Sequence, residues 1–247
     1  MAGPPTIIGV GTNSKAYAPD VNDSGSTRVF SNVEIPATAN TVLLHVGQDA
    51  DFSSKRLNAL TYSGLSNHKV VMDVLPTPTQ NVRITRFAVL DVSGAGAMTI
   101  TVTAQVTNTA GANSSTTGAG ILGVVCTDGF LQNVTLTADR LMEHHKLMVH
   151  QGNSDNTTLV SMGVIDNAAL DDITISTTGA SEIYDTQSGN IQNIAAQQST
   201  VDSDGFQTIV IASDDAADDM AHAVVLLTTL PDAFGGLTGT LTSPLVK

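Results

Sequence analysis

The clearest alternation of apolar and polar positions runs from Asn81 to Val106, NVRITRFAVLDVSGAGAMTITVTAQV. In its second half, apolar and polar residues occupy opposite faces: Met98, Ile100, Val102, Ala104 and Val106 on one, and Thr99, Thr101, Thr103 and Gln105 on the other. A period of two with β-branched residues is typical of a strand that is buried on one side. This half therefore predicts a strand with an apolar inner face and a hydroxyl-rich outer face.

The first half of this stretch is also strand-like, but its phase slips. Val82 and Ile84 share one face, whereas Phe87 and Val89 have the opposite parity. Two explanations remain open: a bulge near Thr85–Arg86, or a strand covered on both faces.

The residues between the two halves predict how they are joined. Ser93-Gly94-Ala95-Gly96 contains two glycines, which tolerate the backbone angles of a tight connection. We therefore expect a long antiparallel hairpin at the centre of an all-β domain.

Further strands are expected at the short spacing of a sandwich or barrel. They are Arg28–Ile35, Thr41–Gln48, Leu57–Tyr62, Lys69–Leu75, Ile121–Thr127, Lys146–His150, Leu159–Ile165, Ile173–Ser176, Gln207–Ala212 and His222–Thr229. Leu141–Lys146 could form a short helix, and Ser213–Asp219 could begin one, although Val224-Val225 favours a strand in the last apolar run. Gly179–Thr200 is predicted as a long loop with one strand at Ser181–Tyr184, and no repeat of fixed period is visible.

The two ends of the chain predict extended arms, residues 1–28 and 232–247, around one sandwich of residues 29–231. Pro4-Pro5 and the Pro19–Gly25 cluster break regular structure. For the first arm two interpretations remain: a disordered tail, or an arm ordered only against a neighbouring subunit, because Thr6–Val10 is apolar.

Four segments together resemble a β-sandwich domain that is widespread in phage virion proteins, including capsid decoration and head proteins, and in bacterial surface proteins. They are Asn40–Val46 (NTVLLHV), Leu60–Gly64 (LTYSG), Met98–Thr103 (MTITVT) and Ala223–Leu227 (AVVLL). The resemblance spans roughly residues 29–231. It implies an antiparallel jelly-roll β-sandwich and transfers no catalytic residue.

Charge and hydropathy exclude some classes of protein. The chain has 23 acidic and 10 basic residues and a formal net charge of −13. This argues against binding to nucleic acid, which needs Lys and Arg at the phosphates, and against docking on anionic membranes. We see no secretory signal and no apolar run of about 18 residues, so we expect a soluble protein made in a cytoplasm.

Two motifs that could suggest chemistry have simpler interpretations. The one cysteine, Cys126, lies in an apolar run and is predicted to be a buried packing thiol. Gly118-Ala-Gly120-Ile-Leu-Gly123 matches G-x-G-x-x-G, but a strand-like run follows where a dinucleotide site needs a helix. We expect a transition from loop to strand there.

The histidines do not predict a metal site. His144 and His150 share a face of the expected strand but lie about 20 Å apart, and His145 points the opposite way. His45 and His222 lie in apolar strands, where a hydrogen-bonded core or interface histidine is expected.

One acidic turn leaves a calcium site open. Asp202-Ser-Asp204-Gly205 is similar to the start of a calcium loop, but no Glu follows to complete it. There is also no G-x-S-x-G elbow and no reason to pair any of the glutamates. We therefore expect no enzyme and no cofactor, and leave open whether Asp202 and Asp204 hold a calcium ion.

Two hypotheses for function follow. The first is a structural virion protein of a bacteriophage, a capsid decoration or stabilising subunit that forms homo-oligomers and binds capsid or other virion proteins through its terminal arms. The alternative is a carbohydrate- or receptor-binding module of a tail fibre or adhesin. For that module the chain offers no Trp, and only Tyr62 and Tyr184 lie within the predicted sandwich.

Overall fold

The computed structural model describes residues 3–20, 25–50, 54–74, 84–116, 118–139, 144–150, 156–166, 174–175, 179–203, 205–212 and 219–229. These residues form an all-β fold in which every pair of strands is antiparallel. Within those ranges there is no helix long and apolar enough to cross a bilayer. The all-β antiparallel class expected from the alternation is confirmed.

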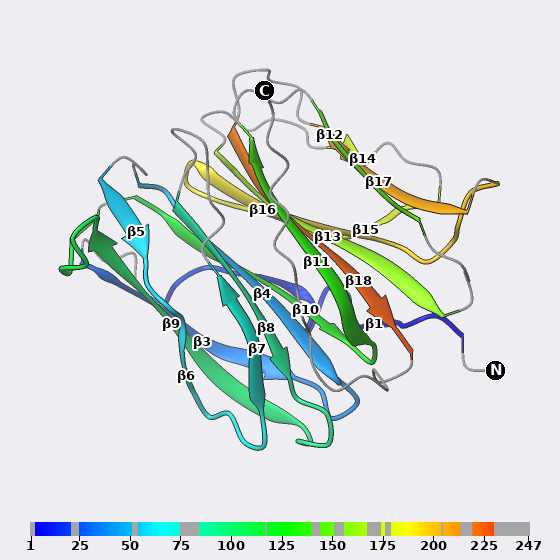
Figure 1. The fold of residues 1–247 in the computed structure, drawn as a ribbon. Coiled ribbons are helices and arrows are strands. Elements are labelled where there is room, and N and C mark those ends of the chain that lie inside the picture. The colour runs from blue at the N-terminus through cyan, green and yellow to red at the C-terminus, as the bar shows by residue number, and fades with distance from the viewer. Residues whose placement is uncertain are drawn as a thin grey trace.

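The described strands form four sheets, which lie on one another as layers (Figure 1). Sheet I contains β3 (Thr27–Ile35), β9 (Met98–Asn108), β5 (Lys55–Leu57) and β6 (Thr61–Ser63). Sheet II contains β1 (Ile7–Ile8), β2 (Lys15–Tyr17), β10 (Gly120–Thr127), β4 (Thr41–Gln48), β8 (Ile84–Asp91) and β7 (Lys69–Val74). Sheet III contains β11 (Phe130–Asp139), β18 (Asp219–Thr228), β13 (Thr157–Asp166), β16 (Ile191–Gln198) and β15 (Ser181–Ser188), and sheet IV contains β12 (His144–His150), β17 (Phe206–Ala212) and β14 (Thr174–Ile175).

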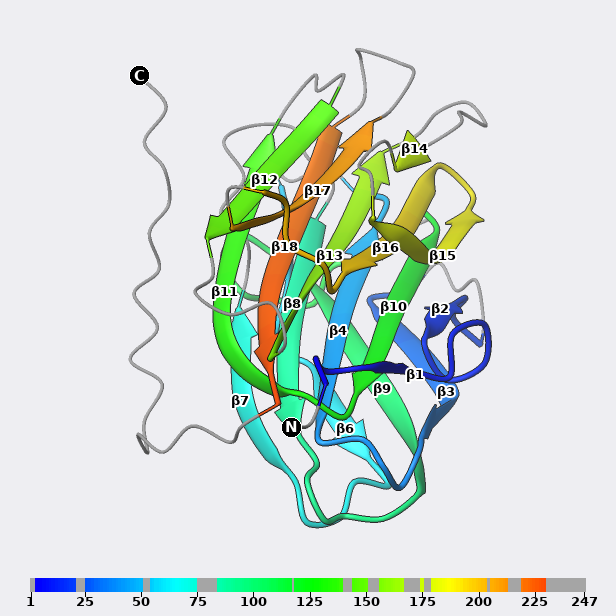
Figure 2. The same ribbon diagram turned by 90° about the vertical axis from the view of Figure 1, so that its right-hand side faces the viewer.

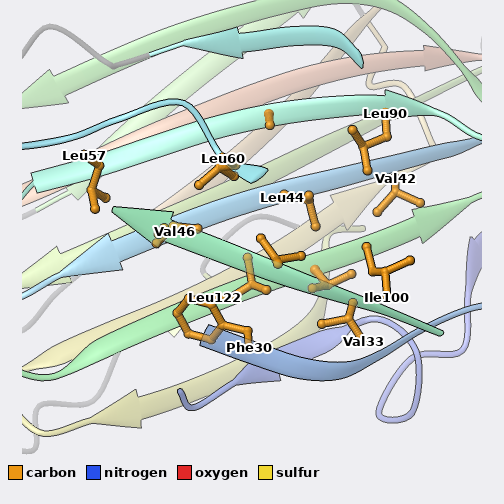
Figure 3. Close-up of a cluster of buried hydrophobic side chains, with 14 of the residues drawn as sticks. Phe30, Val33, Val42, Leu44, Val46, Leu57, Leu60, Leu90, Ile100 and Leu122 are labelled. Carbon is orange, nitrogen blue, oxygen red and sulfur yellow. The ribbon is translucent and has the colours of Figure 1, made fainter. Parts of the chain in front are cut away.

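A hydrophobic cluster fills each space between successive sheets. The first lies between sheets I and II and includes Phe30, Leu44, Ile100 and Leu122 (Figure 3). The second joins sheets II and III, and the third joins sheets III and IV. Sheets II and III are therefore covered on both faces, which is why all the residues of β4 and β10 are buried.

This layering explains the phase slip before Asp91. Ala88 and Leu90 of β8 pack in the first cluster, whereas Phe87 and Val89 pack in the second. The register of β8 against β4 is continuous, so β8 carries no bulge opposite β4. Of the two explanations, a strand covered on both faces is confirmed.

The predicted hairpin of residues 81–106 is wrong. β8 lies in sheet II and β9 in sheet I, and the two do not pair. The connection crosses between the sheets, helped by Gly94 and Gly96 with φ of 74° and 80°. Alternation identifies the two faces of a strand but not its neighbour. The one-sided burial of β9 is confirmed, because Val102 is 0% exposed while Thr101 and Thr103 are half-buried.

The two halves of the chain share one order of strands. When the short β2 and β6 are set aside, eight described strands remain in each half. Sheet II has the order β1-β10-β4-β8-β7 and sheet III the order β11-β18-β13-β16-β15, which is first, eighth, third, sixth and fifth in both. Sheets I (β3-β9-β5) and IV (β12-β17-β14) both have the order second, seventh and fourth. The chain is thus two β-sandwiches with an internal repeat of topology.

The jelly-roll topology implied by the resemblance is not confirmed. Eight strands in two sheets is the strand number of a jelly roll. Here the fifth strand of each half, β7 or β15, lies beside the sixth in the larger sheet, which divides the eight into five and three.

The two sandwiches pack face to face in opposite strand order. β10 contacts β16, β4 contacts β13, and β2 contacts β15. On the other side, β8 and β7 share the second cluster with β18 and β11 (Figure 2). The third strands of the two halves, β4 and β13, contact each other, and the eighth strand of the first half, β10, contacts the sixth strand of the second, β16. This is the arrangement of an isologous two-fold pair within one chain.

The beginning of the chain lies on the molecule's own sheets. β1 and β2 pair with β10 and so supply the first strand of sheet II. The carboxylate of Asp128 accepts hydrogen bonds from the backbone N–H and the hydroxyl of Thr6 at 2.6 Å each, and the Thr158 hydroxyl donates to the Pro5 carbonyl at 2.6 Å. Residues 3–20 therefore need no neighbouring subunit to be ordered. Residues 232–247 lie outside the described part.

Most of the other predicted strands are confirmed, but some predicted segments differ from the structure. Of the twelve strands predicted outside Gly179–Thr200, eleven correspond one to one with described strands, whereas Leu57–Tyr62 is divided into β5 and β6. The long loop predicted at Gly179–Thr200 is wrong, because β15 and β16 form a hairpin there. β11 was not predicted, since a register shift between Leu131 and Asn133 breaks its alternation. The strand favoured for the last apolar run is confirmed as β18.

Candidate functional site

A buried polar cluster lies where sheets II and III meet. The Tyr184 hydroxyl donates to the Asn193 Oδ1 at 2.9 Å, and the Asn193 Nδ2 donates to the backbone oxygen of His45 at 2.9 Å. Gly123 of β10 faces this pair, and a Cβ at that position would lie 2.2 Å from the Tyr184 hydroxyl oxygen. The cluster ties the second sandwich to the backbone of the first.

His45 belongs to the same interface but is not a candidate acid or base at neutral pH. Its ring is 0% exposed and meets Phe87 edge-on, with centroids 5.8 Å apart. Burial lowers the pKa of His45 to about 3, and the backbone of Met162 offsets this only in part. The predicted burial of His45 is confirmed. Neither of its ring nitrogens makes a hydrogen bond of good geometry within the described part of the chain.

Ser161 and His222 form a close contact on the other face of sheet III. The Ser161 hydroxyl meets the Nε2 of His222, and the two residues are 0% and 1% exposed. A serine beside a histidine is part of a hydrolase triad, but a nucleophile must be reachable by substrate. Buried between sheets III and IV, this pair serves packing, and the predicted hydrogen-bonded core histidine is confirmed for His222.

Neither tyrosine of the predicted sandwich is fully exposed. Tyr184 is 6% exposed, and burial raises its pKa well above the ordinary value. Tyr62 packs against the first cluster. Its pKa is also raised, mainly by burial of the hydroxyl and to a smaller extent by the nearby charge of Asp73. A sugar platform needs an exposed aromatic face, which Tyr184 does not offer and the half-buried Tyr62 offers only in part.

Two arginines join loops and strands of the first sandwich. Arg86 pairs with Asp73 and donates to the Leu57 carbonyl at 3.0 Å. Arg28 is 1% exposed. Its guanidinium donates to the backbone oxygens of Gly25, Thr27, Thr116 and Gly118. These cations fix loops to strands rather than facing an anionic ligand.

The possible calcium turn has a structural role in its described part. The Asp202 Oδ1 accepts the Phe206 N–H at 2.8 Å, and the backbone oxygen of Asp202 accepts the Gly205 N–H at 3.1 Å. Asp202 thus caps the turn that leads into β17, while Asp204 lies outside the described residues. Across the described ranges, no three His, Cys, Asp or Glu residues are placed to hold a metal ion.

The remaining sequence candidates are placed as follows. His144, His145 and His150 lie on β12, but their side chains are outside the described set. Cys126 is 0% exposed, and burial raises its pKa to about 12, so its thiol stays protonated as predicted for packing. Gly120 is the first residue of β10, which confirms the transition from loop to strand.

One shallow groove lies beside the first residues of the chain. It has a volume of about 240 Å³ and is lined by Pro4, Pro5, Thr6, Ile7, Gly179, Ser181, Gln197 and Ser199. None of these side chains carries a charge or a strong nucleophile. The sequence did not predict this groove, because it joins segments more than 170 residues apart along the chain.

Comparison with known proteins adds no relative. No family model, no curated protein and no solved structure matches this chain. The fold and the contacts above therefore carry the functional argument alone.

Proposed function

We propose that the chain is a structural virion protein of a bacteriophage, a subunit that decorates or stabilises a capsid through protein–protein contacts. One observation supports this most: side chains that could perform chemistry are used to join layers. His45 and Ser161–His222 are buried between sheets, and Arg28 and Arg86 hold backbone carbonyls. What the described part offers to a partner includes the hydroxyl-rich outer face of β9 on sheet I.

The layered architecture suits a load-bearing part. Sheets II and III are packed on both faces, and close-packed interiors deform little under load. The net charge of −13 suits the outer surface of a shell, away from packaged DNA. Such a subunit acts by burying surface against its neighbours, so we expect a homo-oligomer attached to capsid or other virion proteins.

The structure changes which parts we assign to these contacts. Residues 3–20 are used within the molecule, where β1 and β2 complete sheet II. Attachment then falls to the outer faces of sheets I and IV and to the C-terminal arm 232–247. The carbohydrate- or receptor-binding alternative has no such supporting observation, since Tyr184 is buried and Tyr62 is half-buried against the first cluster.

Fractionation of the native source tests the proposal. Lysate is treated with nuclease and separated on a density gradient, and the protein is quantified across the gradient by mass spectrometry. We expect it to sediment with nuclease-protected DNA in particles. Recovery only at the top of the gradient, as free chains, would contradict a virion role.

A further inference from the structure

His45 lies in the contact between sheets II and III, which we call the joint between the two sandwiches. It belongs to β4, the third strand of the first half, which contacts β13, the third strand of the second half. Its side chain points into the joint, because Leu44 and Val46 on either side of it pack in the first cluster, whereas its pairing partner Phe87 packs in the second. The ring is fully buried, and neither nitrogen makes a hydrogen bond of good geometry within the described part of the chain. Such a site accommodates the neutral ring better than a charged one.

The charged and titratable side chains on the surrounding strands offer no counter-ion to this ring. Asp91 and Lys69 share the face of His45, but they lie level with Thr41, about 13 Å away along β4. Tyr184 also faces the joint, and burial keeps it neutral by raising its pKa well above the ordinary value. The other such side chains on these strands point away from the joint by their place in the strand register: Lys15, Tyr17, Asp73, Arg86, Cys126, Glu182, Asp185 and His222. A proton on His45 would therefore have no anionic partner among the described side chains.

Each sandwich has a core that does not include His45. The first cluster lies between sheets I and II, and the third lies between sheets III and IV. Along the chain, two residues, Asp128 and Gly129, connect β10 of the first sandwich to β11 of the second. Separation of sheets II and III would thus expose the second cluster and hydrate the His45 ring, while the strand pairing within each sandwich stays unchanged.

We propose that His45 makes the joint acid-sensitive: when its ring takes up a proton, the two sandwiches separate at the joint while each keeps its own core. Protonation acts at a residue that also helps to close the joint, because the Asn193 Nδ2 donates to the His45 backbone oxygen across it. This device belongs to the chain itself and does not depend on a virion role.

The size and direction of the effect follow from the two states of the ring. Burial lowers the pKa of His45 to about 3 in the closed chain, whereas a hydrated ring in the open chain has the ordinary value of 6.5. The closed state is therefore fully favoured above pH 6.5 and loses this advantage as the pH falls towards 3. Over that range the equilibrium constant for opening rises by up to about tenfold per pH unit.

Two buried methionines distinguish opening of the joint from unfolding of the whole chain. Met162 packs in the second cluster and Met220 in the third, and both are almost fully buried. Their sulfurs react with hydrogen peroxide when their cluster opens, and the sulfoxides are located by mass spectrometry of peptides. In the full chain, between pH 7.5 and 4.5, we expect oxidation of Met162 to accelerate by up to about tenfold per pH unit below 6.5. Oxidation of Met220 should accelerate much less.

Two variants show whether His45 is the responsible group. His45→Leu should abolish the acceleration at Met162. The matched control His222→Leu, which removes the buried histidine on the other face of sheet III, should retain it. Persistence of the acceleration in a folded His45→Leu chain would overturn the inference. Equal acceleration at Met162 and Met220 in the unmodified chain would also overturn it, because the whole chain would then unfold as one unit, and this comparison needs no variant.

Discussion

Gly123→Ala should separate the energetics of the sandwich interface from those of the sheets themselves. Gly123 faces sheet III, and an added Cβ would lie 2.2 Å from the Tyr184 hydroxyl oxygen and 2.3 Å from the Asn193 Oδ1. Both atoms must move, although they already hydrogen-bond to each other and Asn193 also donates to the His45 carbonyl. The methyl group therefore disrupts packing and hydrogen bonding together.

The expected loss of stability follows from these two effects. Overfilling a packed interior costs about 1–3 kcal/mol. Leaving a buried hydrogen-bonding group unsatisfied costs about 1–3 kcal/mol more. For a chain of this length about 1 kcal/mol shifts the melting temperature by roughly 2–4 °C, so we expect a decrease of roughly 5–20 °C.

Thermal denaturation followed by circular dichroism measures this effect, with Gly163→Ala as the matched control. Gly163 also lies in a buried strand, but its added Cβ would meet the Ile194 side chain at 3.2 Å and Met220 at 3.6 Å. We expect this control to lose about 1 kcal/mol or less. Combining Gly123→Ala with Tyr184→Phe should recover part of the loss. If Gly123→Ala were no more harmful than Gly163→Ala, the proposed close approach of sheets II and III would be refuted.

Three further predictions concern other residues and segments. Val102→Asp places an unpaired charge in the first cluster and should cost several kcal/mol in urea denaturation, whereas Thr101→Asp should cost far less; equal losses would mean that β9 is buried on both faces. Because the pKa of His45 falls from 6.5 unfolded to about 3 folded, its contribution to stability is complete above pH 6.5 and is lost as the pH falls towards 3, by up to about 1.4 kcal/mol per pH unit. Replacement of His45 by Leu should flatten the decline between pH 6.5 and 4.5, and an unchanged slope would contradict the neutral buried state. Deletion of residues 1–20 should lower the melting temperature clearly, since β1 and β2 are lost, while deletion of 232–247 should shift it by only a few degrees; equal effects would mean that the first segment adds nothing to sheet II.

The sequence predicted single strands better than their neighbours. The alternation from Met98 to Val106 identified the buried face of β9 because one side of sheet I faces solvent. In β8 the alternation fails, because sheets cover both of its faces. β16 has no alternation for the same reason, and its amides and alanines have low β-propensity, so its sequence predicts a loop.

The pairing of the strands could not be predicted from the alternation of apolar and polar residues. The hairpin predicted between β8 and β9 relied on closeness along the chain, but the connection passes from one sheet to the next. The internal repeat lies in the order of strands rather than in recurring residues. The clearest sign of the repeat in the amino-acid sequence is short. Val124-Val125 of β10 pairs with Leu44 and Leu43 of β4, and Val224-Val225 of β18 occupies the matching place, paired with Ser161 and Val160 of β13.

The residues of the sandwich interface could be predicted only in part. His45 and His222 were expected in the core on the ground that apolar residues flank them, and the structure agrees. Tyr184 is a candidate for sugar binding in the sequence because it is one of only two tyrosines within the predicted sandwich, and the structure buries it. Its partner Asn193 and the glycine opposite, Gly123, meet only when the two sandwiches pack, and no local pattern marks such a contact.

A cryo-electron microscopy map of native particles from the source is the most direct test of the virion role. The account predicts shell density that repeats with the particle's symmetry and accommodates four stacked sheets, with sheet spacings of about 10 Å. It also predicts that outer faces of this stack contact neighbouring subunits. A complete shell map with no density of this shape, from particles of a source that makes the protein in quantity, would contradict the claim that this chain is a structural part of the virion.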